Sequence, residues 1–367
     1  MLVAIVGGGQ LGQMLALAGV PLGHRFRVLD PAADAPAARV CEHVVGPYDH
    51  PSALDRLVKG ADVLTYEFEN VPVEAVRALE ARLPVFPPPA ALEASQDRLA
   101  EKRLLNDLGI PTAPFAAFSD PASLAQARQA VGGTGAVAKT RRLGYDGKGQ
   151  SVLRGVEDDA GIWRHLGPPG EGYVLEGLVE FRRELSVVAA RDREGNTACY
   201  PLAENVHRDG MLRTSRAPAS ATPEIVETAR SYATRLLDHL GYVGVLAIEL
   251  FDTPEGLLAN EIAPRVHNSG HWTIEGAETS QFENHVRAVT GMPLGPTDPV
   301  GYSVMVNLIG AAPDPREVAA VPDAHLHLYG KDPRPGRKLG HVTVRSDDAE
   351  RAEDHALKVE SLSSDHR

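Results

Sequence analysis

Two glutamates stand where an antiparallel pairing would bring them together. Glu249 and Glu261 lie on two predicted strands, residues 243–251 and 256–262, joined by a turn around residues 253–256. Their numbers average to 255, the middle of that turn, so the two carboxylates are expected on one face, opposite each other. Such a pair destabilises a sheet unless a cation lies between its members, and two carboxylates with substrate phosphates commonly hold Mg²⁺. The alternative is two solvated glutamates on an exposed strand face, which a one-residue shift of register would favour.

A dense group of hydrogen-bond donors follows the second glutamate. Arg265, His267, Asn268, Ser269 and His271 fall within seven residues. Two histidines four apart could bind zinc from one face of a helix, but the proline, asparagine, serine and glycine of this segment disfavour a helix. The absence of a G-x-S-x-G sequence argues against a serine hydrolase. We therefore favour a group of donors that binds a small oxyanion.

A glycine fingerprint lies near the start of the chain. Gly7, Gly9 and Gly12 match G-x-G-x-x-G between a predicted strand and a predicted helix, and Asp30 closes the next predicted strand. In dinucleotide-binding folds such glycines allow a tight turn and let a phosphate approach the helix N-terminus. The pattern equally fits another anionic or nucleotide-like ligand, or close packing of a strand on a helix. The sequence leaves all three interpretations open.

A second glycine-rich segment, residues 144–150, follows a predicted strand that carries Lys139 near its end. Its three glycines expose backbone N–H groups and let the loop fold over a phosphate chain. Lys139 and Lys148 would neutralise phosphate oxygens. The spacing differs from that of a P-loop, and the alternative is an ordinary hairpin loop.

Four basic residues gather near the C-terminus of a chain that is acidic overall. Lys331, Arg334, Arg337 and Lys338 lie within residues 329–340, where two prolines and a glycine disfavour a helix or a central strand. A local excess of positive charge on a stiff loop suits a phosphomonoester. The alternative is a solvated basic loop.

The elements that would position these groups begin with an alternation of short apolar runs and helical patterns. Over the first hundred residues this predicts an α/β fold with a parallel, doubly wound sheet, ended by three prolines at 87–89. The predicted strands cover residues 3–6, 25–29, 63–66 and 85–86, and the predicted helices cover residues 10–18, 53–58 and 73–81.

After residue 96 the pattern changes to strands with antiparallel connections. Ser95 is expected to cap a helix that runs to about Leu108, and a long helix is expected over residues 221–240. The polar chain after residue 346 is expected to fray. The remaining predicted strands cover residues 136–140, 151–154, 173–175, 185–190, 197–201, 243–251, 256–262, 302–309, 325–329 and 341–344.

Length and composition indicate a globular protein of two or three domains. The 367 residues carry a net charge of −12, which argues against a protein that coats nucleic acid. Cys41 and Cys199 match no zinc spacing and exclude a disulfide scaffold. With no apolar run near the roughly 20 residues of a membrane span and no signal peptide recognised, we expect a cytoplasmic protein with no membrane or nucleic-acid partner.

Together, these segments resemble the ATP-grasp superfamily and, more narrowly, its 5-(carboxyamino)imidazole ribonucleotide synthase family. The resemblance runs from about residue 2 to about residue 345, and HNSGHWT and RPGRKLGH are its most specific stretches. It implies an N-terminal domain (1–95), an α+β ATP-grasp domain (96–296, with a lid at about 111–178) and a small C-terminal domain (297–367). The tail does not resemble the usual ending of the family.

The resemblance also implies an ATP-dependent carbon–nitrogen ligase of purine biosynthesis. ATP, bicarbonate and aminoimidazole ribonucleotide would give ADP, phosphate and the carboxyamino ribonucleotide through carboxyphosphate. ATP is then the co-substrate, Mg²⁺ or Mn²⁺ the metal, and a homodimer the expected assembly.

The residues implied by the resemblance fall into four groups. The ATP contacts are Arg98, Lys139, Gly144, Tyr145, Asp146, Gly147, Lys148, Gly149, Gln150, Glu176, Gly177, Leu178, Val179, Glu184, His207, Asn260 and Glu261. The metal ligands are Glu249 and Glu261. Bicarbonate and carboxyphosphate would contact Arg265, His267, Asn268 and Ser269. The ribonucleotide would contact Gly9, Gln10, Leu11, Glu67, Tyr145, Asp146, Lys331, Arg337 and Lys338.

Three rival functions are considered. Another ATP-grasp ligase, either a formate-dependent ribonucleotide transformylase or a biotin-carboxylase-like enzyme, would share most of these residues. An NAD-dependent oxidoreductase built on the first domain would leave Glu249, Glu261 and Lys139 without a role. A non-catalytic nucleotide-binding module is disfavoured by the complete acidic pair.

Overall fold

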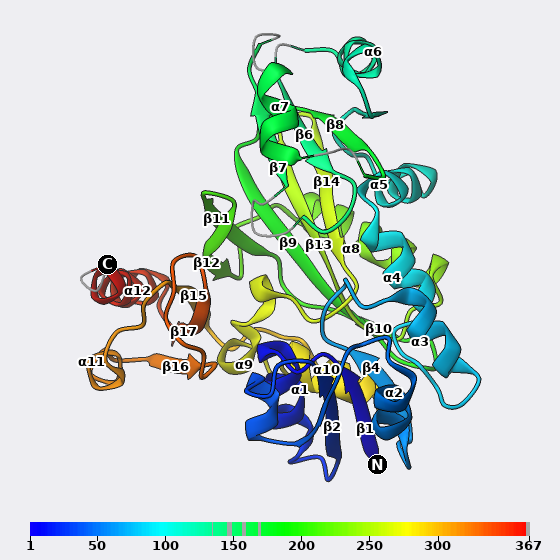
Figure 1. Ribbon diagram of the computed structural model, residues 1–367. Coiled ribbons are helices and arrows are strands. Elements are labelled where there is room, and N and C mark those ends of the chain that lie inside the picture. The colour runs from blue at the N-terminus through cyan, green and yellow to red at the C-terminus, as the bar shows by residue number, and fades with distance from the viewer. Residues whose placement is uncertain (134, 145–148, 156–158, 168–169, 365–367) are drawn as a thin grey trace.

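The N-terminal part of the chain is a four-stranded parallel sheet in the order β3-β2-β1-β4. The computed structural model describes residues 1–133, 135–144, 149–155, 159–167 and 170–364 (Figure 1). The strands are β1 (Leu2–Val6), β2 (Arg25–Asp30), β3 (Glu42–Val45) and β4 (Val63–Tyr66).

Helices cover both faces of this sheet. On one face lie α1 (Gln10–Gly19) and α10 (Gln281–Thr290), and on the other lie α2 (Pro51–Val58) and α3 (Val73–Glu80). Alternate residues of β1 enter the two cores, Val3 and Ile5 on the α1 side and Ala4 and Val6 on the α2 side. The predicted doubly wound α/β sheet is therefore confirmed, with α10 supplied by a distant part of the chain.

One predicted strand of this sheet is wrong. Residues 85–86 form no strand, and Val85 makes only an isolated bridge to Leu64. The fourth strand is β3, at the opposite edge, where it pairs with β2. Only Val44 of its four residues is buried. An edge strand of this kind carries little apolar pattern, which is why the sequence did not indicate it.

Two helices replace the single helix expected from Ser95 onward. Ser95 lies inside α4 (Pro89–Gln96), and α5 (Arg98–Asp107) begins after Asp97. The Asp97 carboxylate accepts the N–H of Leu99 and is the true N-cap. The prediction was wrong because it chose the first of two capping residues in the segment.

A small antiparallel sheet stands at the top of Figure 1, in the order β5-β8-β6-β7. Helices α6 (Pro121–Val131) and α7 (Asp159–Leu166) flank it. The rings of Phe118, Trp163 and Tyr173 pack against one another in its core. The strands are β5 (Phe115–Phe118), β6 (Ala136–Thr140), β7 (Gln150–Leu153) and β8 (Tyr173–Gly177).

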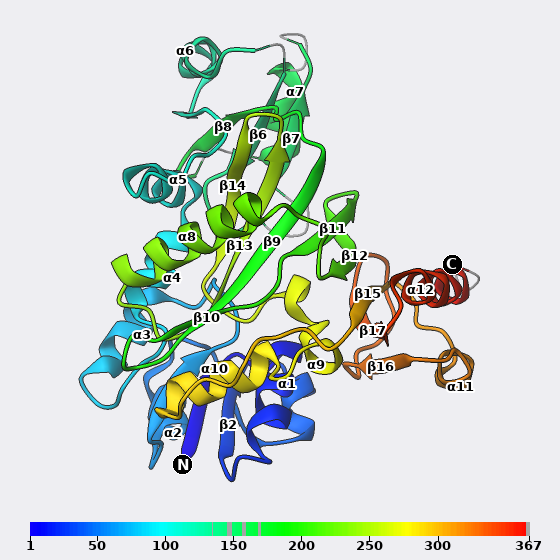
Figure 2. The ribbon, with the colours of Figure 1, turned by 180° about the vertical axis from the view of Figure 1, so that it is seen from behind.

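A larger sheet runs through the middle of the molecule in the order β14-β13-β9-β11-β12-β15-β17-β16, with β10 paired to β9. Helix α8 (Pro223–His239) packs on β9 and β13, as Figure 2 shows from behind. The strands are β9 (Arg183–Arg191), β10 (Thr197–Cys199), β11 (Ala203–Arg208), β12 (Met211–Ala217), β13 (Gly244–Thr253), β14 (Gly256–Ala263), β15 (Tyr302–Ile309), β16 (Ala324–Leu328) and β17 (Lys338–Ser346).

The expected frayed tail is wrong for the residues that the structure describes. Residues 349–364 form α12 (Ala349–Ser364), which packs on β15 and β17. Ala352, Ala356 and Val359 are buried against Val304 and Val306. Three small apolar side chains at helical spacing are enough to dock a helix that is otherwise polar.

The connecting helices are short. They are α9 (Thr273–Gly276), α11 (Pro315–Ala319) and the 3₁₀ segments η1 (Pro36–Arg39) and η3 (Asn268–Gly270). Within the described residues, no helix combines the length and the apolar character needed to cross a membrane.

Candidate active site

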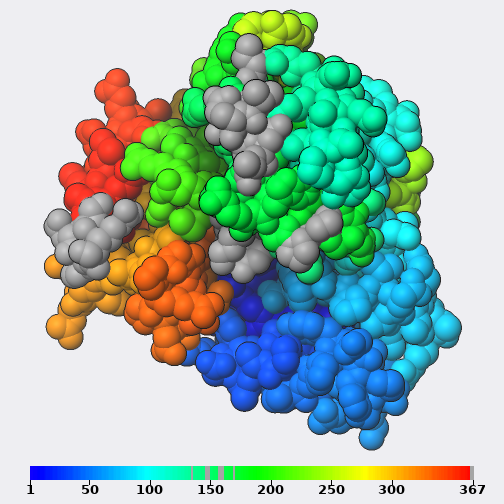
Figure 3. Space-filling view, turned by 45° about the horizontal axis from the view of Figure 1, so that its top comes forward, coloured from blue at the N-terminus to red at the C-terminus, as the bar shows by residue number. Residues whose placement is uncertain are grey.

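One cavity of about 1040 Å³ collects the predicted site residues from every part of the fold. The space-filling view shows a hollow beside the blue N-terminal part, with green and orange parts around it (Figure 3). Every predicted site residue that the structure describes lines this cavity, except Gly9, Gly149 and Ser269. Tyr145, Asp146, Gly147 and Lys148 lie outside the described residues.

The acidic pair sits on β13 and β14. These strands are joined by a tight turn in which Thr253 opposes Gly256. If the ladder continued regularly from that turn, Glu249 would oppose Asn260. In the structure Glu249 opposes Glu261, so the predicted pairing is confirmed.

A β-bulge causes this pairing. Leu250 opposes Ala259 and Glu249 opposes Glu261, which leaves Asn260 as the extra residue of β14. A bulge turns side chains away from strict alternation. Asn260 and Glu261 both line the cavity as a result.

The acidic pair is electrostatically suited to a cation. Burial, followed by the negative charge of Glu261, raises the pKa of the Glu249 carboxyl to about 7. A divalent cation between the two carboxylates would favour their ionised forms. Among the described residues, no group of three or more His, Cys, Asp and Glu side chains is arranged to hold a metal. A cation bound to this pair therefore takes its other ligands from elsewhere, as Mg²⁺ does from substrate phosphates.

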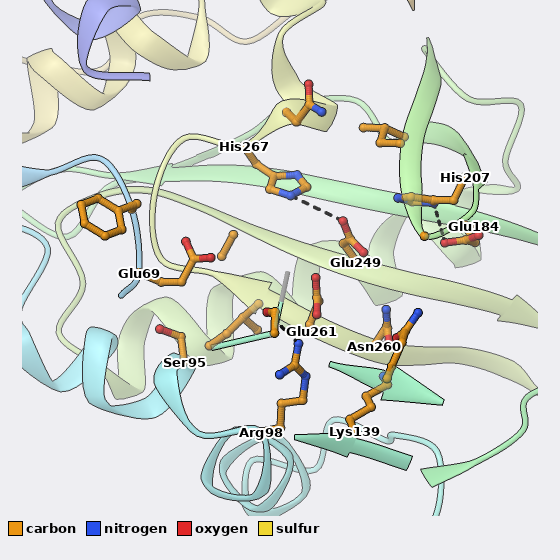
Figure 4. A pocket seen from close by; sticks show the side chains of 18 of the residues that line it. Glu69, Ser95, Arg98, Lys139, Glu184, His207, Glu249, Asn260, Glu261 and His267 are labelled. Atoms are coloured by element: carbon orange, nitrogen blue, oxygen red, sulfur yellow. Dashed lines mark hydrogen bonds and ion pairs between the residues drawn. The ribbon is translucent and has the colours of Figure 1, made fainter. Parts of the chain in front are cut away.

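His267 lies beside the acidic pair, with its Nε2 atom 3.4 Å from Oε1 of Glu249 (Figure 4). Burial, and then the charge of Arg265, lower the pKa of His267 well below its usual value, so the ring is neutral. The N–H of Ser269 donates to Nδ1, and the proton of the neutral ring therefore points from Nε2 toward Glu249. Ser269 is fully buried behind His267 and orients this ring.

The donors expected for an oxyanion lie next to this histidine. Arg265 forms a short ion pair with Glu69, and Glu69 raises the pKa of Arg265 although burial opposes this. Both polar atoms of the Asn268 side chain are buried and have no hydrogen-bond partner among the described residues. Since Asn268 lines the cavity, its amide is available to a ligand there.

A second charged pair lies further along the cavity. Nδ1 of His207 on β11 is 2.8 Å from Oε2 of Glu184 on β9 (Figure 4). Burial disfavours the charged ring, but the bond to Glu184 and the charge of Glu249 raise the pKa of His207. The cavity therefore holds a protonatable ring near the acidic pair.

The small sheet and helix α5 contribute a buried network of charges. Nζ of Lys139 lies 3.1 Å and Nζ of Lys102 lies 2.9 Å from the same oxygen of Glu176. Burial disfavours the Glu176 charge, but the two lysines lower its pKa. Arg98 donates to the carbonyl oxygens of Thr140 and Gly144, at 3.0 Å each, and so fixes the start of the second glycine segment.

The first glycine segment is already occupied by a carboxylate of the protein. Glu67 accepts the backbone N–H groups of Gly9, at short distance, and of Gly12, at 2.7 Å. Asp30 accepts from Gly8 and from the Tyr48 hydroxyl. Glu67 thus occupies the backbone N–H groups that a dinucleotide pyrophosphate would need, and Asp30, which would bind the ribose, is already engaged by the protein. The geometry therefore opposes the NAD interpretation.

The basic loop faces this segment from the C-terminal part. Lys331 donates to Oε1 of Gln10 at 2.5 Å, and burial lowers its pKa. Arg337 and Lys338 line the same end of the cavity. The structure thus brings together the start of the chain and residues more than 300 positions later.

Several residues at this site were not predicted, among them four with ionisable side chains. Glu69, Glu101 and Tyr329 line the cavity, and Lys102 lies behind it. Glu69 follows the carboxyl end of β4, the edge of a parallel sheet where ligands bind, so its position was a usable signal. Glu101 and Lys102 sit in a polar helix whose sequence marks neither of them.

Comparisons with known proteins agree along the whole chain. Three family models match: a ribonucleotide synthetase pre-ATP-grasp domain (1–96), an ATP-grasp domain (103–282) and a phosphoribosylaminoimidazole carboxylase C-terminal domain (303–355). The N5-carboxyaminoimidazole ribonucleotide synthase of Pseudomonas aeruginosa is 51% identical over 362 residues, covering 99% of each chain. The chain belongs to this family. It is accordingly an ATP-grasp ligase, which confirms the predicted enzyme class.

Solved structures of the family agree with the fold. The synthetase of Thermus thermophilus superposes with a TM-score of 0.94 at 53% identity, covering 99% of this chain and 98% of that one. The Aspergillus clavatus synthase, solved with ADP and 5-aminoimidazole ribonucleotide, superposes with a TM-score of 0.91 at 30% identity, covering 99% and 98%. The predicted three-part architecture is confirmed by these matches.

Proposed function

We propose that this chain carboxylates 5-aminoimidazole ribonucleotide to 5-(carboxyamino)imidazole ribonucleotide, with ATP and bicarbonate consumed and ADP and phosphate released. The observation that carries this proposal is a single cavity that joins three kinds of group. These are the opposed carboxylates Glu249 and Glu261, the free amide of Asn268, and the basic loop with Lys331 and Lys338. They match a magnesium nucleotide, a small oxyanion and a phosphomonoester.

At the nucleotide end, the role of the small sheet is to hold the phosphates. Lys139 supplies a positive charge for the phosphate oxygens, and Arg98 holds the glycine segment at Gly144. At the other end of the segment, Gly149 precedes β7, which begins at Gln150. The strand end at Glu176, Gly177, Leu178 and Val179 lines the cavity beside them and supplies backbone groups to the adenine. Glu184, His207 and Asn260 complete this end, and Glu184 is assigned to the ribose hydroxyls because it lines the cavity there.

Glu249 and Glu261 would hold Mg²⁺, or Mn²⁺ in its place. When bound, the ion neutralises charge that develops on the transferred phosphoryl group. The protein residues keep their geometry through the bulge at Asn260 and through His267, whose Nε2–H faces Glu249.

In the first step, a bicarbonate oxygen attacks the γ-phosphorus and ADP leaves, which forms carboxyphosphate. Arg265 and Asn268 bind the oxyanion, His267 orients it, and Ser269 holds the His267 ring. In the second step the amine of the ribonucleotide takes the carboxyl group from carboxyphosphate, or from CO₂ released from it, and phosphate departs with the proton that the amine loses. The protein contributes positioning, charge neutralisation and exclusion of water.

The ribonucleotide end is built from both termini of the chain. Lys331, Arg337 and Lys338 are assigned to its phosphate. Gly9, Gln10, Leu11 and Glu67 form the opposite wall, with Glu67 holding the loop in shape. Tyr145 and Asp146, outside the described residues, are assigned to the aminoimidazole.

The test is ADP release in a coupled assay, with MgATP, bicarbonate and 5-aminoimidazole ribonucleotide each omitted in turn. We expect ADP release to need all three. Release that is indifferent to the ribonucleotide would refute the substrate assignment. A requirement for formate in place of bicarbonate, or for biotin, would favour the other ATP-grasp ligases.

Three further expectations belong to this proposal. The homodimer is tested by sedimentation of the purified chain, and the cytoplasmic location by cell fractionation. The domain boundaries at 95/96 and 296/297, and the lid at about 111–178, are tested by limited proteolysis.

A further inference from the structure

Helix α5 covers the free edge of the strand that carries Glu261. Strand β14 is an edge strand of the large sheet, so one row of its backbone groups faces away from β13. The N–H of Ala259 in this row donates to the carbonyl oxygen of Pro111 at 2.8 Å. Two side chains of α5 form hydrogen bonds with backbone groups of this row, one on each side of Glu261.

Glu101 and Lys102 are those two side chains. Oε1 of Glu101 accepts the N–H of Ile262 at 2.6 Å, and Nζ of Lys102 donates to the carbonyl oxygen of Asn260 at 3.2 Å. The two residues are only 3% and 1% exposed. A buried backbone group that loses its partner is costly, because burial has already removed its hydrogen bond to water. These contacts are therefore tight constraints on the backbone that flanks Glu261.

These two contacts lie at the β-bulge, next to the metal-ligand position Glu261. Asn260 is the extra residue of the β-bulge, and Glu261 follows it. A bulge leaves its extra residue without a partner in the ladder, so its position depends on contacts from outside the sheet. Here Lys102 holds the bulge residue and Glu101 holds the backbone just past the metal-ligand position.

The same helix also reaches the nucleotide end of the cavity. Nζ of Lys102 shares the Glu176 carboxylate with Lys139. At the start of α5, Asp97 forms an ion pair with Arg141, and Arg98 holds the carbonyl of Gly144. Helix α5 thus binds both the acidic strand and the base of the second glycine segment.

We propose that Glu101 and Lys102 are positioning residues that set Asn260 and Glu261 in place for a magnesium nucleotide. Neither is a ligand in this scheme, and Glu101 acts as a hydrogen-bond acceptor whether its carboxyl is charged or neutral. The inference rests on the proposed function, because it assigns these residues to the same site. Partners of this kind typically change metal affinity by about 10–100-fold when removed.

The test compares two substitutions of Glu101 in the full-length protein. Glu101→Gln keeps an oxygen acceptor for the Ile262 N–H, and Glu101→Leu keeps the size but removes the acceptor. The readout is binding of ADP by calorimetry as Mg²⁺ is titrated, together with the Michaelis constant for the ribonucleotide. A thermal melt gives the folded fraction of each variant.

We expect Glu101→Gln to keep the Mg²⁺ half-saturation within about twofold and Glu101→Leu to raise it by roughly tenfold or more. The Michaelis constant for the ribonucleotide should stay within about twofold in both. A folded Leu variant with unchanged Mg²⁺ dependence would overturn the inference. A Gln variant as impaired as the Leu variant would also overturn it, because charge would then matter in place of the acceptor.

A second pair keeps the test decisive if Glu101→Leu does not fold. Lys102→Met removes the ammonium and keeps the stem, and Arg103→Met makes the same change at the exposed neighbouring position of α5. We expect weaker binding of MgADP only for Lys102→Met, and equal binding by the two variants would overturn the inference. This readout uses no ribonucleotide, so it is independent of the omission assay. ADP release that does not need the ribonucleotide would refute the proposed substrate and would leave the positioning role intact.

Discussion

Replacing Glu249 by glutamine tests the electrostatics of the acidic pair. The carboxyl has its pKa raised from 4.5 to about 7, first by burial and then by Glu261. At 1.36 kcal/mol per unit, this shift corresponds to about 3 kcal/mol. Since the two carboxylates titrate as a pair, we assign this figure to the pair as a whole.

The sign of the effect follows from proton linkage. Between pH 4.5 and about 7 the folded protein keeps a proton that the unfolded chain has lost, so stability falls as pH rises through this window. Glutamine does not ionise and removes this loss. We therefore expect Glu249→Gln to be about 3 kcal/mol more stable than the parent at pH 8 and to differ little at pH 4.5.

The assay is urea unfolding of parent and variant at pH 4.5, 6 and 8 without divalent metal. Glu255→Gln, at an exposed position of the same hairpin, is the control and should show no such pH-dependent difference. Adding Mg²⁺ and ADP at pH 8 should stabilise the parent much more than Glu249→Gln, because only the parent keeps both carboxylates. A stability difference between parent and variant that is the same at all three pH values would refute the like-charge interpretation.

Three other substitutions test separate parts of the site. Glu261→Gln should abolish Mg²⁺-dependent turnover with the fold retained by circular dichroism, and normal turnover would remove the metal assignment. Lys338→Ala should raise the Michaelis constant for the ribonucleotide by roughly tenfold or more and that for ATP much less, so an equal effect on both would show that the basic loop does not bind the ribonucleotide phosphate. Gly9→Ala would place a Cβ atom 2.5 Å from Oε1 of Glu67, so it should lower the melting temperature and weaken ribonucleotide binding, and wild-type values for both would contradict the role of Glu67 in shaping this loop.

The sequence predicts best the strands that carry a clear apolar pattern. Strands β4, β6 and β15 have the predicted bounds, and β1 and β2 differ from them by one residue. Strands β1 and β4 are buried throughout and β15 nearly so, whereas β2 and β6 combine buried apolar positions with exposed or half-buried polar ones. Strand β3 and helix α12 were missed because they are held by few apolar contacts at the edge of the fold.

The opposed pairing of Glu249 and Glu261 was predicted correctly, but the reasoning left out the β-bulge that produces it. Averaging the numbers of Glu249 and Glu261 placed them opposite each other, and they are opposite. The structure reaches this result through a two-residue turn and a bulge at Asn260, which compensate for each other. Helix α5 contacts β14 at the bulge, and these contacts join residues about 160 positions apart, so no local pattern in the sequence indicates them.

The same reasoning explains why the glycine fingerprint was ambiguous. A strand, three glycines and a helix create an N-terminus that needs a negative partner, and the motif does not specify which one. Here the partner is Glu67, supplied by the chain itself from the end of β4. Only the structure shows that this position is filled, so that of the three open interpretations the dinucleotide site is disfavoured and the segment forms one wall of a cavity. The site is therefore built by long-range pairs such as Glu67 with Gly12 and Glu101 with Ile262, which no local pattern in the sequence joins.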